Sequence, residues 1–175
     1  MANPDPKQEI INKLSRLLLP RASASDGKKE GERTLRFLKE RCIAGRQIHF
    51  VLFEDKKGQQ IHFTCYVEQN AVGDWQFRGA AGDGITGTPG PVVEQGWANL
   101  GGGGMPDHFY AGGYVADYGL DITHVRLIAK NGTVIEDTVE NGIVLFLTDQ
   151  PVALPIEAEI YDRDGKLVYK HRVLS

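Results

Sequence analysis

The chain has 175 residues, of which 41% are hydrophobic and 25% charged, so it is long enough to bury one sizeable core. A net charge of −3 does not predict a nucleic-acid partner, and the absence of an 18-residue apolar run predicts no membrane span. Acidic residues stand where a signal peptide is basic, and there are only two cysteines. We therefore expect a reduced, cytoplasmic protein in which Cys42 and Cys65 are buried thiols.

The chain begins with a predicted amphipathic helix over about Pro6–Leu19. Asp5 can cap it, Pro6 suits the first helical position, and Pro20 ends it. Its apolar stripe consists of Ile10, Ile11, Leu14, Leu17 and Leu18. Because so short a helix is marginal alone in water, the stripe must dock on the chain's own sheet, on a second protomer or on another protein.

A polar, aperiodic stretch, RASASDGKKEG, follows at residues 21–31 and predicts a flexible linker. We therefore divide the chain into an arm, residues 1–31, and a single β-sandwich domain, residues 32–175. A short helix is predicted at the start of this domain, over Glu32–Ile43. Leu35, Leu38 and Cys42 have the spacing of one helical face, and Gly45 can end the helix. Residues 1–45, the arm together with the start of the domain, have a net charge of +4, and residues 46–175 have −7. This basic N-terminal part either exposes a solvated face or reaches an acidic partner.

The segments RQIHFVLFE and QQIHFTCYVEQ flank a DKKG turn and predict a β-hairpin. Pairing Glu54 with Gln59 makes the apolar faces of the two strands coincide. This register also makes His49 and His62 diagonal neighbours on one face. The two imidazoles either share a metal ion with an unidentified third ligand or are ordinary strand histidines, which is the reading we prefer.

A third strand is predicted around residues 74–78, after which the chain becomes rich in glycine. Residues 79–104, GAAGDGITGTPGPVVEQGWANLGGGG, predict a Gly-rich loop, and loops of this length are often functional. The segment GDGITG matches the glycine pattern of a dinucleotide site, but the TPGP that follows prevents the required helix. We therefore predict no cofactor.

From Phe109 onward, short β-branched and aromatic runs alternate with Asn-Gly and Asp-Gly pairs, which favour tight hairpin turns. Ile143–Leu147 is apolar on both faces and predicts a strand covered on both sides. With seven or eight short strands, we expect a mainly β protein, an antiparallel two-sheet β-sandwich with an N-terminal α-helical arm. A partly open β-barrel is the alternative. The resemblance to immunoglobulin-like and fibronectin-type sandwiches is one of architecture only, because the Cys–Trp–Cys core spacing is missing.

The sequence lacks an evident catalytic constellation, and we lean toward a protein that is not an enzyme. Its serines lie in the arm or at position 175, and no G-x-S-x-G elbow occurs. The segment DRDG begins like a calcium loop, but Lys166 and Val173 occupy ligand positions. We therefore predict a hairpin turn there and no metal site.

A candidate ligand site lies in the glycine-rich stretch and its neighbours. Aromatic and carboxylate side chains on loops beside a rigid sheet are typical of sandwiches that bind sugars, peptides or ions. The candidate residues are Asp83, Trp97, Asn99, Asp107, His108, Tyr110, Tyr114 and Tyr118. The alternative is that the aromatic side chains belong to the core and the glycines permit close chain crossings.

Two functions are therefore considered. The first is a non-catalytic protein-interaction or assembly module whose N-terminal helix docks on a partner or a second protomer. The second is a sandwich that binds a small ligand or carbohydrate, with or without catalysis, through residues 79–119. A basic arm that binds nucleic acid or a membrane surface is the weakest reading, because the body is acidic.

Overall fold

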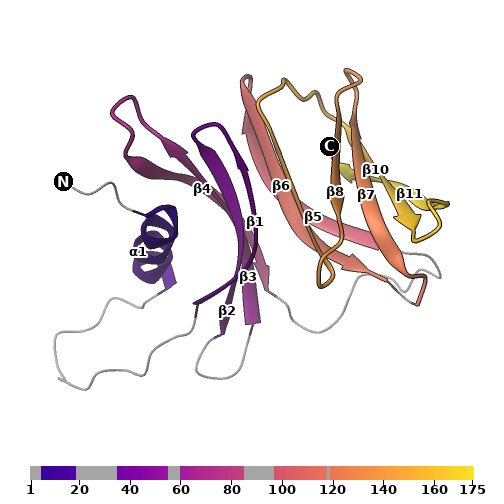
Figure 1. Ribbon diagram of the computed structural model, residues 1–175, viewed down its shortest axis with the longest axis horizontal. Coiled ribbons are helices and arrows are strands. Elements are labelled where there is room, and N and C mark those ends of the chain that lie inside the picture. The colour runs from indigo at the N-terminus through magenta and orange to yellow at the C-terminus, as the bar shows by residue number, and fades with distance from the viewer. Residues whose placement is uncertain (1–4, 19–34, 55–59, 85–96, 118) are drawn as a thin grey trace.

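In the computed structural model, which describes residues 5–18, 35–54, 60–84, 97–117 and 119–175, the chain forms one helix and eleven strands (Figure 1). In chain order these elements are α1 (Pro6–Leu18), β1 (Leu35–Ile43), β2 (Arg46–Glu54), β3 (Gln60–Gln69), β4 (Trp75–Gly84), β5 (Trp97–Met105), β6 (His108–Ala116), β7 (Ile122–Ala129), β8 (Val134–Thr138), β9 (Ile143–Thr148), β10 (Ile156–Asp162) and β11 (Leu167–Leu174). The described helix is too short and too polar to cross a membrane.

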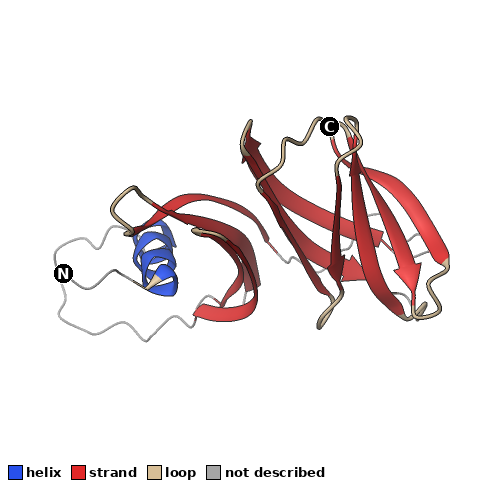
Figure 2. Ribbon diagram, turned by 45° about the horizontal axis from the view of Figure 1, so that its top comes forward, coloured by secondary structure: helices blue, strands red, loops and turns tan. Residues whose placement is uncertain are grey.

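The strands make three antiparallel sheets. The N-terminal sheet has the order β1-β2-β3-β4, the central sheet β5-β6-β9, and the C-terminal sheet β11-β10-β7-β8. The sheets stack in layers, and α1 lies against the N-terminal sheet on the side away from the other two (Figure 2). The predicted mainly β, antiparallel sandwich with an N-terminal helix is confirmed. It has three sheets rather than two, and none of the described sheets closes on itself into a barrel.

The central sheet is covered on both faces, and β9 shows this most clearly. Ile143 and Leu145 pack with Ile48 and Phe50 of the N-terminal sheet, whereas Val144 and Phe146 pack in the core shared with the C-terminal sheet. Since successive side chains of a strand point to opposite faces, a strand between two cores must be apolar at every position. The coverage on both sides predicted for residues 143–147 is confirmed, although β9 is an edge strand of its own sheet.

Helix α1 uses part of its apolar stripe on the chain's own N-terminal sheet. Asp5 Oδ1 accepts a hydrogen bond from the Lys7 amide at 3.0 Å, which is the predicted cap. Ile10 and Leu14 are fully buried against three β2 and β3 side chains, Val51, Cys65 and Val67. Ile11 is half-buried and Leu17 is 64% exposed, while the side chain of Leu18 lies outside the description. Two residues of the predicted docking stripe are therefore already occupied within the chain.

Residues 35–43 form strand β1, so the predicted short helix over Glu32–Ile43 is wrong. The pairing of β1 with β2 contains a bulge between Phe37 and Lys39. A bulge changes which face the following side chains take, so Phe37 points toward α1 whereas Lys39 and Arg41 point toward β8 and β9. The same bulge interrupts the alternation of side chains along the strand. The spacing of Leu35, Leu38 and Cys42 therefore resembles that of one helical face. Cys42 is exposed on this strand, contrary to expectation, whereas Cys65 is buried as expected.

Strands β2 and β3 form the predicted hairpin, but in a register one residue away from the predicted one. Glu54 pairs with Gln60 rather than Gln59. A shift of one residue sends side chains to the opposite face, so His49 lies on the helix side while His62 stacks on Phe50, with ring centroids 5.2 Å apart. The two histidines therefore cannot share a metal ion. The sequence misleads here because β2 is buried on both faces, so it lacks the alternation that would identify the register.

Much of the predicted glycine-rich loop over residues 79–104 is strand. Strand β4 extends to Gly84, and β5 begins at Trp97 and includes Gly101–Gly104. Residues 85–96 lie outside the described part of the chain. Glycine is depleted in strands because it packs no side chain, so propensity alone assigned these residues to a loop. Here they belong to strands that approach one another closely.

Candidate functional site

The structure brings together three of the predicted site residues, Asp107, His108 and Tyr110, at the turn between β5 and β6 and in the first residues of β6. Trp97 and Asn99 lie at the other end of β5, and Asp83 lies near the end of β4, five residues beyond Arg78. Tyr114 packs edge-on against Phe50 and His62 between the sheets, in agreement with the alternative of a core residue. Tyr118 lies outside the described residues.

A cleft of about 540 Å³ opens between the N-terminal sheet and the end of the β5–β6 hairpin. Its size lies within the range typical of sites for small molecules or single side chains. The N-terminal sheet contributes Tyr66, Glu68 and Arg78, and the central sheet contributes Gly103, Gly104, Asp107, His108 and Tyr110. The cleft is therefore aromatic in its depth and charged at its mouth.

Tyr66 forms the back of the cleft, between two other rings. Its ring stacks on His108 at 4.7 Å and on Tyr110 at 5.0 Å, measured between ring centroids. Burial, together with the hydrogen bond that the Tyr66 hydroxyl donates to Glu68 at 2.8 Å, raises the pKa of Tyr66 far above its usual value. The stack fixes the imidazole of His108, so the cleft is shaped before any ligand arrives.

An ion-pair network connects the two sides of the mouth. Arg78 Nε lies 2.9 Å from Glu68 Oε1, and Arg46 Nη2 lies 3.0 Å from Asp107 Oδ2. The other oxygen of Asp107 lies 3.0 Å from His108 Nδ1 and, because a carboxylate only accepts, this ring nitrogen carries the proton. The bond to His108 holds the pKa of Asp107 below its usual value, with a smaller contribution from Arg46. All four carboxylate oxygens at the mouth therefore have a partner.

Two donors in the cleft have no partner among the described residues. The Tyr110 side chain is only 7% exposed, yet its hydroxyl has no hydrogen bond to any described group. It lies where a Cβ added at Gly79 or Gly103 would approach it within 2.7 and 3.0 Å, so glycine at both positions makes room for it. Arg78 contacts Glu68 through Nε, and with its side chain 47% exposed the guanidinium can be reached from the cleft. Because Tyr110 lines the cleft, its hydroxyl can donate a hydrogen bond to an acceptor group that enters.

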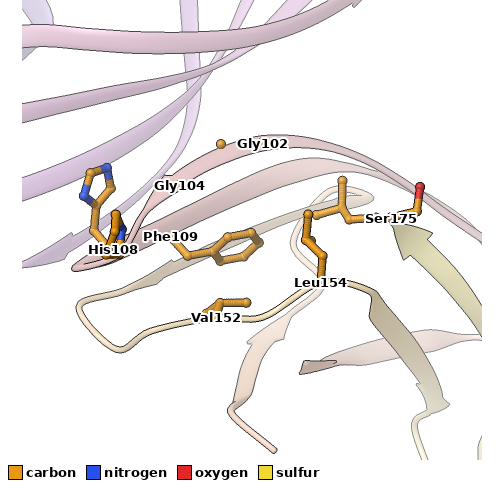
Figure 3. A pocket seen from close by; sticks show the side chains of 10 residues that line it. Gly102, Gly104, His108, Phe109, Val152, Leu154 and Ser175 are labelled. Atoms are coloured by element: carbon orange, nitrogen blue, oxygen red, sulfur yellow. The ribbon is translucent and has the colours of Figure 1, made fainter. Parts of the chain in front are cut away.

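A second hollow, of about 550 Å³, lies on the opposite face of the same hairpin (Figure 3). Figure 3 shows His108 projecting away from it, whereas Phe109 points into it, toward Val152 and Leu154. The two hollows share Gly103, Gly104 and His108 in their linings. The end of the hairpin therefore separates two hollows. We call the first the polar cleft after its charged side chains and the second the apolar hollow after Phe109, Val152, Leu154 and Leu174, although His108 and Ser175 also line the second.

Sequence reasoning missed four residues of the polar cleft: Arg46, Tyr66, Glu68 and Arg78. A signal for two of them was present, because Tyr66 and Glu68 alternate onto one face of β3. Nothing in the sequence placed that face opposite His108, since the two segments meet only through the stacking of two sheets. The described residues also contain no group of three His, Cys, Asp or Glu side chains arranged to hold a metal ion.

Comparison of the chain with protein-family models, with curated proteins and with solved structures finds no match.

Proposed function

We propose that this protein is a non-catalytic interaction module that holds a protein partner at the cleft between the N-terminal sheet and the β5–β6 hairpin. The observation that carries the proposal is the pair of unpartnered donors, the Tyr110 hydroxyl and the terminal nitrogens of Arg78, in a cleft whose carboxylates are already paired. Such a site favours an acceptor-bearing group, and a carboxylate on the partner would gain a charge-assisted hydrogen bond from the guanidinium. The cleft lining offers no serine or cysteine nucleophile, which supports binding rather than covalent catalysis.

The N-terminal helix has fewer apolar side chains available for docking on a partner than the sequence predicts. Ile10 and Leu14 are buried against the chain's own sheet, and Leu17 is the large apolar side chain that the described helix exposes. A partner or a second protomer would therefore meet α1 through Leu17. Substituting Leu17→Asp and measuring mass in solution by light scattering tests this contact, and an unchanged mass at all concentrations contradicts self-association through the helix.

Selection from a library of random twelve-residue peptides displayed on phage, with the full chain immobilised, tests the proposal directly. We expect enrichment of peptides with an acidic residue, and about a tenfold loss of their binding to Arg78→Ala and to Tyr110→Phe, as for loss of one charge-assisted hydrogen bond. Arg163→Ala and Tyr169→Phe are matched controls on the C-terminal sheet and its turns. No enrichment over the bare surface, or equal binding to all four variants, contradicts the proposal.

The second candidate function is the binding of a small polar ligand such as a carbohydrate. The specific observation that favours it is the cleft volume of about 540 Å³ with aromatic rings, carboxylates and a guanidinium in one lining. Titration of the labelled protein with methyl glycosides, followed by amide NMR shifts, separates the two functions. Saturable shifts in wild type that Arg78→Ala removes, in a protein that selects no peptide, would favour the carbohydrate.

A further inference from the structure

The two edge strands of the central sheet, β9 and β5, differ in whether side chains bond to their outward main-chain groups. On the β9 edge, Asp137 Oδ2 accepts a hydrogen bond from the Leu145 amide at 2.7 Å, and Lys39 Nζ donates to the Ile143 carbonyl at 3.0 Å. Charged side chains directed at an edge strand prevent further strand pairing. On the β5 edge, no described residue bonds to the outward main-chain groups, and β5 pairs with β6 alone.

Four residues of strand β5 have no side chain that could shield the main chain. Residues Gly101–Gly104 are four consecutive glycines at the end of the strand nearest the β5–β6 turn. An unprotected edge with exposed amides and carbonyls is a template for an added strand. We call this edge, to which no described residue bonds, the open edge; its residues Gly103 and Gly104 line both hollows.

The hollows lie on opposite faces of this open edge. The polar cleft with Arg78 and Tyr110 faces the N-terminal sheet, and the apolar hollow with Phe109, Val152 and Leu154 faces the C-terminal sheet. Side chains of an extended peptide alternate between the two faces of a sheet. A peptide that extended the central sheet beyond β5 would consequently place one side chain in each hollow in turn.

We infer that β5 accepts an extended segment of the partner protein as an added strand, and that the segment alternates acidic and aliphatic residues. This inference rests on the proposed function and names its partner chemistry. Acidic side chains meet the unpartnered Arg78 nitrogens and the Tyr110 hydroxyl. Aliphatic side chains of leucine size meet Phe109, Leu154 and Leu174, of which Leu154 is 52% exposed without a partner strand. Main-chain bonds supply affinity, and the two hollows supply the alternating specificity.

Two synthetic peptides of one composition test the alternation by calorimetric titration of the full chain. The first is Ac-Gly-Leu-Glu-Leu-Glu-Gly-NH2 and the second is its block isomer, Ac-Gly-Leu-Leu-Glu-Glu-Gly-NH2. We expect the block isomer to bind at least about tenfold more weakly, because it places one leucine and one glutamate side chain in the wrong hollow. Equal binding of the two isomers would overturn the inference.

N-methylation tests whether the peptide pairs through one edge. In a strand, alternate amides point to opposite edges, so methylating both leucine amides blocks one edge and methylating both glutamate amides blocks the other. We expect one methylated peptide to lose about tenfold or more in affinity and the other to stay within about threefold of the parent. If both methylated peptides bind alike, whether strongly or weakly, the added strand is contradicted.

Variants of the chain connect the binding to the two hollows. Leu154→Asp is expected to weaken binding of the alternating peptide about tenfold. Val134→Asp, at an aliphatic position that is also exposed but lies on the far edge of the C-terminal sheet, should leave binding unchanged. Peptides selected from the phage library that are insensitive to N-methylation would remove the added strand and leave the proposed function intact. If neither synthetic peptide binds and the library also selects no peptide, both the added strand and the proposed function are contradicted. A dimer of the chain that the alternating peptide does not dissociate would assign the edge to a second copy and overturn the inference.

Discussion

We predict that buried His49 lowers the stability of this protein as the pH falls from neutral to pH 4. Its side chain is fully buried on the helix side of the N-terminal sheet, where Nε2 lies 3.0 Å from Gln47 Oε1 and the ring packs edge-on against Phe37. Nδ1 lies 3.5 Å from the nearest Glu40 oxygen. Burial lowers the pKa of His49 from 6.5 to about 4, with Lys7 adding to the effect and Glu40 and Asp5 opposing it.

The direction of the effect follows from proton counting. Above pH 6.5 the imidazole is neutral in both the folded and the unfolded state and contributes no pH dependence. Between pH 6.5 and pH 4 the unfolded chain binds a proton that the folded chain does not, so the stability decreases as the pH falls. At 1.36 kcal/mol for each pKa unit, the loss at pH 4 amounts to about 3 kcal/mol.

The test compares wild type with His49→Leu, which removes the titrating group and keeps the site apolar. Urea unfolding at pH 7 and pH 4, followed by tryptophan fluorescence, gives the free energy of unfolding of each protein. We expect the decrease from pH 7 to pH 4 to be about 3 kcal/mol larger in wild type. Carboxylates contribute equally to both proteins and cancel in this difference. An equal decrease in the two proteins would refute the argument that His49 is held neutral by burial.

Three further predictions concern the layers of the fold. Lys39→Met should lower the free energy of unfolding in urea by about 3 to 5 kcal/mol, because it leaves the Asp137 carboxylate, 2.6 Å from Lys39 Nζ, buried without its ammonium partner. A decrease below about 1 kcal/mol would show that Arg41 alone satisfies the carboxylate. Leu14→Ala should cost about 2 to 5 kcal/mol and Leu17→Ala less than about 0.5, since only Leu14 is buried; equal costs would mean that α1 does not dock as described. Gly112→Ala should cost about 1 to 3 kcal/mol, because the new Cβ would lie 2.6 Å from Thr64 Oγ1 between two sheets; an unchanged thermal midpoint would contradict this close approach.

Local patterns in the sequence identified most of the strands but failed where the local pattern was broken. The Asn-Gly and Asp-Gly pairs located the turns of the C-terminal hairpins, because few residue types adopt the positive φ that tight turns require. Positive φ occurs at Asn141, Gly132, Gly142 and Gly165. The β1 bulge and the register of the β2–β3 hairpin were missed, since both depend on what covers each face. A strand that is buried on both faces does not alternate apolar and polar side chains, so its pairing register cannot be predicted from the sequence.

The sequence predicts only part of the candidate site, because only some of its residues are close together in the chain. Asp107, His108 and Tyr110 were accessible to sequence reasoning because they are adjacent in the chain and follow a glycine run. Tyr66, Glu68 and Arg78 were not, because they reach His108 only when two sheets stack. The same stacking places the Tyr110 side chain in the lining of the cleft, which no local pattern reveals.

The sequence by itself determined the secondary structure class: turn residues, hydrophobic period and a capped helix are local properties that few residues decide. Only the tertiary structure decided that residues 79–84 and 97–104 of the glycine-rich stretch belong to strands and that Lys39 and Asp137 bond to one edge of the central sheet, whereas no described residue bonds to the other. It also decided that two hollows flank the end of the β5–β6 hairpin. These features arise from contacts between residues distant in the chain, and their free energy depends on how whole sheets pack rather than on any segment alone.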